Sequence, residues 1–163
     1  IGEFMEKYEG RFSEGLIKAL GHSELTARDM NHEYQGTEHL LLGILREGGD
    51  GSRIIAKHFT ISDVRRVDIL LRPHIYILVK KGSEKEYEKN NVLHLTPRAK
   101  KALDYTMEEA DADNVHKVGI DYLLLGLLRE QDGVAAQVLM NLDFRLEDLR
   151  SSIREERYLA LIR

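Results

Sequence analysis

The sequence contains no cysteine among its 163 residues, which excludes disulfide bonds and thiolate metal sites. Proline is scarce as well, because Pro73 and Pro97 are the two in the chain, and both lie outside the segments of helical periodicity. Long uninterrupted helices are therefore favoured. The absence of thiols fits a reducing compartment, and we expect the protein in the cytoplasm.

Long apolar runs and charge of one sign are also missing. No segment reaches the roughly 18 apolar residues of a membrane-spanning helix, and no secretion signal precedes the first periodic segment. The 28 acidic and 24 basic residues are interspersed and leave a formal charge of −4. A nucleic-acid binder would carry a basic patch. We therefore expect neither a membrane nor a nucleic acid as a partner.

The patterns of the common reactive sites are absent too. The chain has no Gly-x-x-x-x-Gly-Lys-Ser/Thr phosphate loop and no Gly-x-Ser-x-Gly elbow. Seven histidines are present, but no His-x-x-x-His pair falls within one predicted helix. We therefore expect a non-catalytic protein that holds neither a cofactor nor a metal ion.

An internal duplication organises what is present. The segment Gly36–Glu47 is echoed by Gly119–Glu130 at an offset of 119 − 36 = 83, and this offset runs back to Phe12 and Leu95. Of these 36 aligned positions, 13 are identical, whereas unrelated segments would match at roughly one position in fifteen. Beyond Glu47 the register continues at an offset of 82, with Gly51 opposite Gly133. The sequence therefore predicts two copies of one unit.

Each copy predicts four helices. In the first copy, Ser13 caps the first helix, which ends at Asn31, and Thr37 is placed to cap the second. The third covers about 52–58, and the fourth begins at Ser62 or Asp63. In the second copy Thr96 is the cap and Pro97 the first helical residue, and later helices fall near 121–130, 134–140 and 146–157. The leucine runs 40–42 and 123–125 are predicted to fill the core.

The predicted fold class is all-α, with two pseudo-symmetric four-helix repeats packed as one compact domain. We interpret residues 1–10 as a cloning remnant and N-terminal extension, 11–72 as repeat 1, 73–94 as a linker, 95–157 as repeat 2 and 158–163 as a C-terminal extension. Within the linker, Lys80–Asn91 is polar and predicted to be exposed and mobile. The apolar Ile75–Val79 fits a strand, a continued helix, a sticky segment that pairs outside the repeat or, as we favour, a cover over the seam between the copies.

Three motifs in order carry a resemblance to a known family. They are Asn31–Gly43 with its Gly-Thr-Glu-His sequence, Leu95–Lys101, and Gly133–Leu139. At these motifs the chain resembles the double Clp-N repeat of ClpC-type Hsp100 unfoldases, which are AAA+ ATPases. The resemblance implies a domain that receives protein substrates or adaptor proteins for a Clp protease. It also implies recognition of phosphorylated arginine as a degradation tag.

The candidate ligand residues lie at helix starts. A helix N-terminus suits a phosphate group, so Ser13 with Arg11, and Thr96 with Lys100, are candidates. The Glu38 carboxylate, beside Thr37, would pair with a guanidinium, and it matches the acidic residue of the family's Gly-Thr-Glu-His motif. In copy two Asp121 takes this place and is shorter by one methylene. Helix capping and dipole complementarity alone also explain Ser13, Thr37, Glu38 and Thr96.

Three hypotheses for the function remain open. The first is the recruitment domain of a Clp unfoldase, in which 155–163 begins a connection to an ATPase module. The second is a stand-alone accessory protein of the same fold that docks on a Clp protease and regulates it. The third is a small hydrolase that uses Glu38 and a neighbouring histidine, which predicts a deep pocket around a carboxylate of raised pKa.

Overall fold

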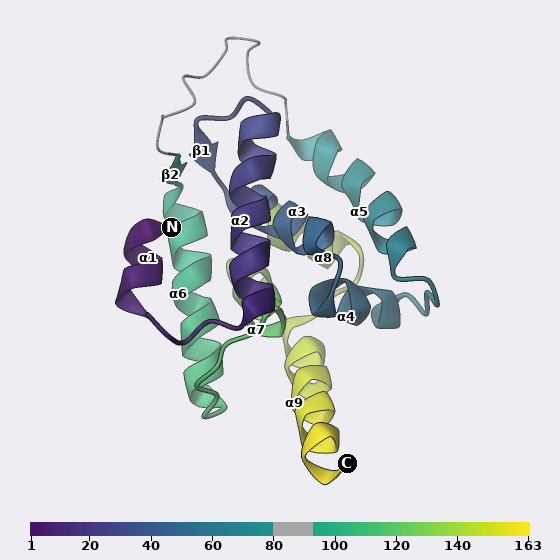
Figure 1. Ribbon diagram of the computed structural model, residues 1–163. Helices are drawn as coiled ribbons and strands as arrows, with labels where there is room; N and C mark the ends of the chain where they lie inside the picture. The colour runs from purple at the N-terminus through teal and green to yellow at the C-terminus, as the bar shows by residue number, and fades with distance from the viewer. Residues whose placement is uncertain (80–92) are drawn as a thin grey trace.

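The computed structural model describes residues 1–79 and 93–163, and nearly all of its regular structure is helical (Figure 1). This confirms the predicted all-α class. The elements are α1 (Gly2–Lys7), α2 (Glu14–Asp29), β1 (Tyr34–Gln35), α3 (Thr37–Glu47), α4 (Asp50–His58), α5 (Arg65–Leu78), β2 (His94–Leu95), α6 (Pro97–Ala112), α7 (Ile120–Arg129), α8 (Val134–Asn141) and α9 (Leu146–Ile162). The order α2 to α5 is repeated as α6 to α9, as the duplication predicts.

The predicted helix ends of both copies recur in detail. The Ser13 hydroxyl accepts a hydrogen bond from Leu16 N, and the Thr96 hydroxyl accepts one from Ala99 N, so both residues are N-caps. At the other end of these helices Asn31 and Asn114 share the left-handed conformation, with φ of 56° each. These features confirm the predictions for Ser13, Thr96 and Asn31. Such helix ends can be predicted because they depend on residues close together in the sequence.

Short parallel bridges link the two copies. Residues Tyr34–Gln35 of β1 pair with His94–Leu95 of β2, and Phe12 pairs with Val118 at the equivalent positions of the opposite copies. The segment before the second helix of each copy therefore lies beside the segment before the first helix of the other, as Figure 1 shows for β1 and β2. Helix contacts follow the same rule, because α3 packs on α8 and α7 packs on α4.

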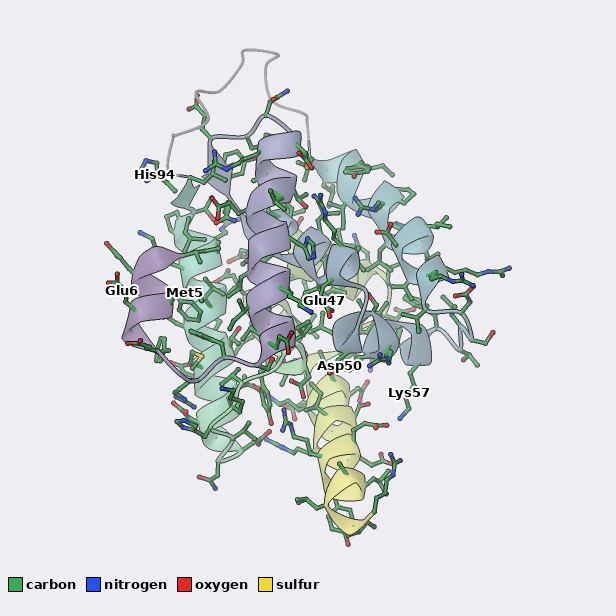
Figure 2. All side chains as sticks on the ribbon, in the orientation of Figure 1. Met5, Glu6, Glu47, Asp50, Lys57 and His94 are labelled. Carbon is green, nitrogen blue, oxygen red and sulfur yellow. The ribbon has the colours of Figure 1, made fainter. Side chains whose placement is uncertain are left out.

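The core confirms the prediction for the leucine runs. The leucines at 40–42 and 123–125 are at most 1% exposed, and they form one cluster together with residues of both copies. A further ion pair joins the copies at the surface, where Lys57 of α4 contacts Glu156 of α9 at 2.8 Å; Figure 2 labels Lys57. The two repeats thus share one hydrophobic interior rather than meeting at a flat interface.

Thr37 does not cap α3, contrary to the prediction. The N-cap is Gly36, whose backbone is extended, and Thr37 is the first helical residue. The buried Thr37 hydroxyl instead accepts a hydrogen bond at 3.2 Å from the backbone N–H of Ala135, at the start of α8 in the other copy. Sequence reasoning missed this bond because its partners lie 98 residues apart.

Replacing Thr37 by Val should lower the free energy of unfolding by about 1–2 kcal/mol, because the buried Ala135 N–H loses its acceptor while the side-chain shape is kept. Urea unfolding monitored by circular dichroism would measure the loss. The variant Thr37→Ser keeps the hydroxyl and should retain most of the stability. Equal stability of Thr37→Val and the wild type would show that the bond contributes nothing.

The fourth helix of copy one differs from its prediction at both ends. It begins at Arg65 rather than at 62 or 63, and it continues to Leu78, so Pro73 lies inside the helix. Of the alternatives for Ile75–Val79, the continued helix is right and the strand is wrong, because α5 includes 75–78. Ile75 is fully buried, and the favoured position over the seam between the copies stays a prediction. Pro73 cannot donate to the carbonyl of Ile69, but Ile69 is 74% exposed, so water can reach that part of the helix. The polar part of the predicted linker, Lys80–Asn91, lies outside the described residues.

Both ends of the chain are helical beyond the predicted repeats. Residues 2–7, interpreted above as part of a remnant and extension, form α1, and the Phe4 ring packs on Phe12 with centroids 5.2 Å apart. At the other end α9 runs to Ile162, five residues beyond the predicted end of the repeat at 157. No helix in the described ranges 1–79 and 93–163 is long and apolar enough to span a membrane.

Candidate functional site

The candidate residues gather at two places, and each place draws on both copies. Thr96 N donates to the carbonyl of Gln35 at 2.9 Å, which sets the start of α6 beside the start of α3; we call this the Glu38 site. Ser13 N donates to the carbonyl of Val118 at 2.9 Å, which sets the start of α2 beside the start of α7; we call this the Asp121 site. The sequence grouped the helix start at Ser13 with Glu38 of the same copy, whereas the bridges pair the copies crosswise.

The Glu38 carboxylate is buried without a cation. Its residue is 7% exposed, and the carboxylate folds back over Gly36, in the space that a β-carbon at Gly36 would occupy. The closest ionisable nitrogen recorded is Nδ1 of His39 at 3.8 Å, and no lysine or arginine pairs with Glu38 within the described residues. Burial raises the pKa of Glu38, against a lowering by its own backbone N–H and by His32.

Two buried histidines, His39 and His32, lie next to the Glu38 carboxylate. Gly36 N donates to Nδ1 of His39 at 2.9 Å, so that nitrogen is an acceptor and the proton of a neutral ring must sit on Nε2. Nε2 of His39 lies 2.7 Å from Nδ1 of His32, whose ring stacks on Tyr34 with centroids 4.9 Å apart. The acceptor role of Nδ1 fits a neutral His39. Burial, followed by the charge of His32, lowers the pKa of His39 to about 3.

The stability of the protein should therefore fall as the pH drops below neutrality. His39 has an ordinary pKa of 6.5 when unfolded and about 3 when folded, so the unfolded chain binds a proton that the folded chain refuses. The contribution is fully present above pH 6.5 and is lost progressively down to pH 3. Between pH 7 and pH 5 we expect a loss of about 2 kcal/mol.

Urea unfolding at several pH values checks this dependence. The variant His39→Phe should be less stable at pH 7 but should lose less stability on acidification than the wild type. His74→Gln removes an exposed histidine and should keep the wild-type slope. The raised pKa of Glu38 should increase the stability on acidification, opposite to the effect of His39. Repeating the series in Glu38→Gln removes this contribution. Parallel curves for His39→Phe and the wild type would contradict the assignment.

The Asp121 site is arranged differently. Arg157 of α9 donates to Oδ2 of Asp121 at 3.0 Å, and its guanidinium lies 4.7 Å from the centre of the Tyr122 ring. Burial raises the pKa of Asp121, while the charge of Arg157 opposes this shift. At the offset of 82 the residue equivalent to Arg157 is Ile75, so the Glu38 site has no such arginine. Of the two site carboxylates, Asp121 is thus already paired with a guanidinium of the chain itself, that of Arg157.

The remaining candidates are placed as follows. Arg11 donates to Asp111 at 2.7 Å and to the carbonyls of Val115 and His116, so much of its guanidinium is engaged in holding the other copy. Lys100 is exposed and lines a cavity of about 420 Å³ between α1, β2 and α6. No recorded contact joins Lys100 to Glu38. Within the described residues no group of three histidines or carboxylates could hold a metal ion.

Two intertwined copies of one four-helix unit, with polar helix starts placed crosswise, define a double-repeat helical domain. Residues 94–160 match the family model described as the Clp repeat (R) N-terminal domain. The chain is 35% identical over 144 residues to the ATP-dependent Clp protease ATP-binding subunit ClpC of Staphylococcus saprophyticus, and equally to that of Staphylococcus epidermidis. The chain belongs to the Clp N-terminal domain family.

Solved structures show the same fold. The N-terminal domain of the caseinolytic protease associated chaperone ClpD from Arabidopsis thaliana aligns with a TM-score of 0.66 and 19% identity, over 91% of this chain and 95% of that one. A chain from structural work on a malarial protein secretion system aligns with a TM-score of 0.73 and 17% identity, over 90% and 95%. The ClpC alignments cover 88% of this chain but 16% of the relatives' length, so the chain corresponds to one domain of those proteins.

Proposed function

We propose that this chain is a non-catalytic recruitment domain of a ClpC-type ATPase in the cytoplasm, which binds protein substrates or adaptors for a Clp protease. Homology to ClpC supports the coarse assignment. Within this role we propose that the Glu38 site recognises phosphoarginine. The guanidinium of the ligand would pair with the Glu38 carboxylate, and its phosphate would lie toward the start of α6.

The lack of a lysine or arginine partner for Glu38 in the described part of the chain supports this proposal. A buried carboxylate without a cation is costly, and its raised pKa is the expression of that cost. A ligand guanidinium would remove the cost and gain charge-assisted hydrogen bonds. At the Asp121 site Arg157 already supplies such a group, so an incoming guanidinium would have to displace it. We therefore propose that the Glu38 site binds the tag more tightly.

The raised pKa of Glu38 is also what a hydrolase would need for a general acid. However, Glu38 lines neither the cavity of about 500 Å³ between α2, α3 and α5 nor that of about 420 Å³ between α1, β2 and α6. The adjacent His39 is fully buried and uses Nδ1 to accept the Gly36 N–H. A binding role therefore agrees better with the geometry than catalysis.

Titration of free phosphoarginine, followed by amide chemical shifts of the ¹⁵N-labelled chain, tests the proposal. We expect the amides of Gly36, Glu38 and Thr96 to shift at lower concentrations than those of Gly119 and Asp121. Arginine and inorganic phosphate, titrated separately, should shift them much less. If the amides of Gly36 to Glu38 stay unmoved at millimolar phosphoarginine, tag recognition at this site is excluded, whereas the family assignment stands.

A further inference from the structure

A second surface of repeat 1 has the features of a binding site. A cavity of about 500 Å³ lies between the C-terminal parts of α2, α3 and α5. In Figure 1, α5 runs along the outside of the molecule next to α3. The described residues that line the cavity combine two arginines with apolar and small polar side chains: Thr26, Asp29, Met30, Arg46, Arg72, Tyr76 and Val79.

Repeat 2 shows what these arginine positions bind. At the two offsets Arg46 corresponds to Arg129, and Arg72 corresponds to Arg154. In repeat 2 Arg129 contacts Glu108 at 2.9 Å and Glu109 at 3.3 Å, and Arg154 contacts Asp113 at 3.0 Å. Glu109 lies in the last turn of α6, and Asp113 is the C-cap residue that follows it. Glu109 also pairs with Arg150 of α9, and repeat 1 has Asp68 at the position equivalent to Arg150. The duplicated fold therefore places two carboxylates against this pair of guanidinium groups.

Repeat 1 keeps the arginines but has lost these acids. The positions that correspond to Glu109 and Asp113 hold Thr26 and Met30, and both of these residues line the cavity. Arg46 contacts Asp29 at 3.1 Å, but the Asp29 side chain is 67% exposed, and exposed pairs of this kind contribute little. The cavity thus lies where repeat 2 carries its own acidic side chains.

The Arg72 side chain is positioned by two residues of its own helix, α5. It pairs with Asp68 one turn earlier and donates to the hydroxyl of Tyr76 at 2.9 Å. Guanidinium has five N–H donors, so these bonds leave others available. Apolar side chains border the charges, because Met30, Tyr76 and Val79 line the cavity and Tyr76 is 46% exposed. Large exposed apolar side chains next to a charged cavity are typical of interaction surfaces.

We propose that this cavity binds an acidic, partly apolar segment of a partner protein. Two carboxylates of the segment would take the places that Glu109 and Asp113 hold in repeat 2, and an apolar side chain would cover Met30 and Tyr76. The chain as a whole has a formal charge of −4, so a partner of this kind is selected by the local arginine pair and not by overall attraction. This site is separate from the Glu38 site and does not depend on phosphoarginine recognition.

A matched pair of peptides tests the proposal on the intact chain. The probe is a fluorescein-labelled peptide Glu-Glu-Leu-Tyr-Glu-Glu, and its control has glutamine at every glutamate position. We expect the acidic peptide to bind at least about tenfold more tightly, as loss of charge-assisted hydrogen bonds implies. It should also shift the methyl resonance of Met30. Equal binding of the two peptides, or binding without a shift at Met30, would overturn the proposal.

Variants locate the binding. Arg46→Gln and Arg72→Gln should each weaken the acidic peptide at least about fivefold, whereas Arg66→Gln, an exposed arginine of the same helix α5, should leave it unchanged. Thr26→Glu supplies the carboxylate that repeat 2 has at this position and should weaken the peptide as much as Arg46→Gln. Inorganic phosphate that displaces the peptide at equal concentration would identify a general anion site and contradict a carboxylate-bearing partner.

Discussion

Gly126→Ala and Gly43→Ala should each lower the free energy of unfolding by about 3 kcal/mol, although alanine is the better helix former. A β-carbon at Gly43 would overlap the carbonyl oxygen of Ala19 and lie 2.8 Å from Ser23 N, both in the backbone of α2. At Gly126 it would overlap the carbonyl oxygen of Ala102 in α6. A helix backbone cannot move aside locally, so the two helices must separate and lose packing.

Gly21 provides the matched control. It lies in α2, is exposed, and has no atom within 4 Å of an added β-carbon. Gly21→Ala should therefore raise the stability by about 0.5–1 kcal/mol through helix propensity alone. Thermal unfolding would separate the cases, since about 3 kcal/mol corresponds to roughly 6–12 °C in a domain of this size. If Gly43→Ala were as stable as Gly21→Ala, the close crossing of α2 and α3 would be wrong.

Much of the fold could be predicted because its signals are local or repeated. The duplication fixed the number of helices and their equivalence, and the caps at Ser13 and Thr96 follow from side chains that bond a residue three positions away. The end of α2 at Asn31 is equally local. The C-terminal part of α5 could be predicted only as one of several alternatives, because Pro73 is normally a helix breaker and its tolerance depends on exposure.

The relation between the copies could not be read from the sequence. The bond from Ala135 to Thr37 joins residues of opposite copies that lie 98 positions apart. Even within copy two, the pair of Arg157 with Asp121 joins residues 36 positions apart. Hydrophobic periodicity in the sequence does not indicate that these residues meet. The requirement for glycine at position 43 likewise depends on a helix crossing. For the Glu38 site, the sequence identified the carboxylate and the helix start at Thr96, but it did not predict that opposite copies contribute them.

The asymmetry between the two sites predicts the second large effect. Glu38→Gln should weaken phosphoarginine binding at least about thirtyfold, because removing one partner of a buried charge pair costs about 2 kcal/mol or more. The fold should not suffer, since the raised pKa of Glu38 shows that its charge is disfavoured in the folded state. Isothermal titration calorimetry measures the affinity, and thermal unfolding checks the fold.

Gly36→Ala should displace the Glu38 carboxylate from its position while leaving the residue itself in place. The backbone of Gly36 has φ of −101° and ψ of −179°, which alanine also adopts, so the change should be tolerated. However, the new β-carbon would occupy the place of the Glu38 carboxylate and turn it away, and binding should fall at least about tenfold. Gly119→Ala is the equivalent change in copy two and serves as the control, although its β-carbon crowds Asp121 less, at 2.9 Å from Oδ1. Because Arg157 already holds Asp121, Gly119→Ala should leave the tighter binding event intact, whereas equal losses in both variants would refute the asymmetry.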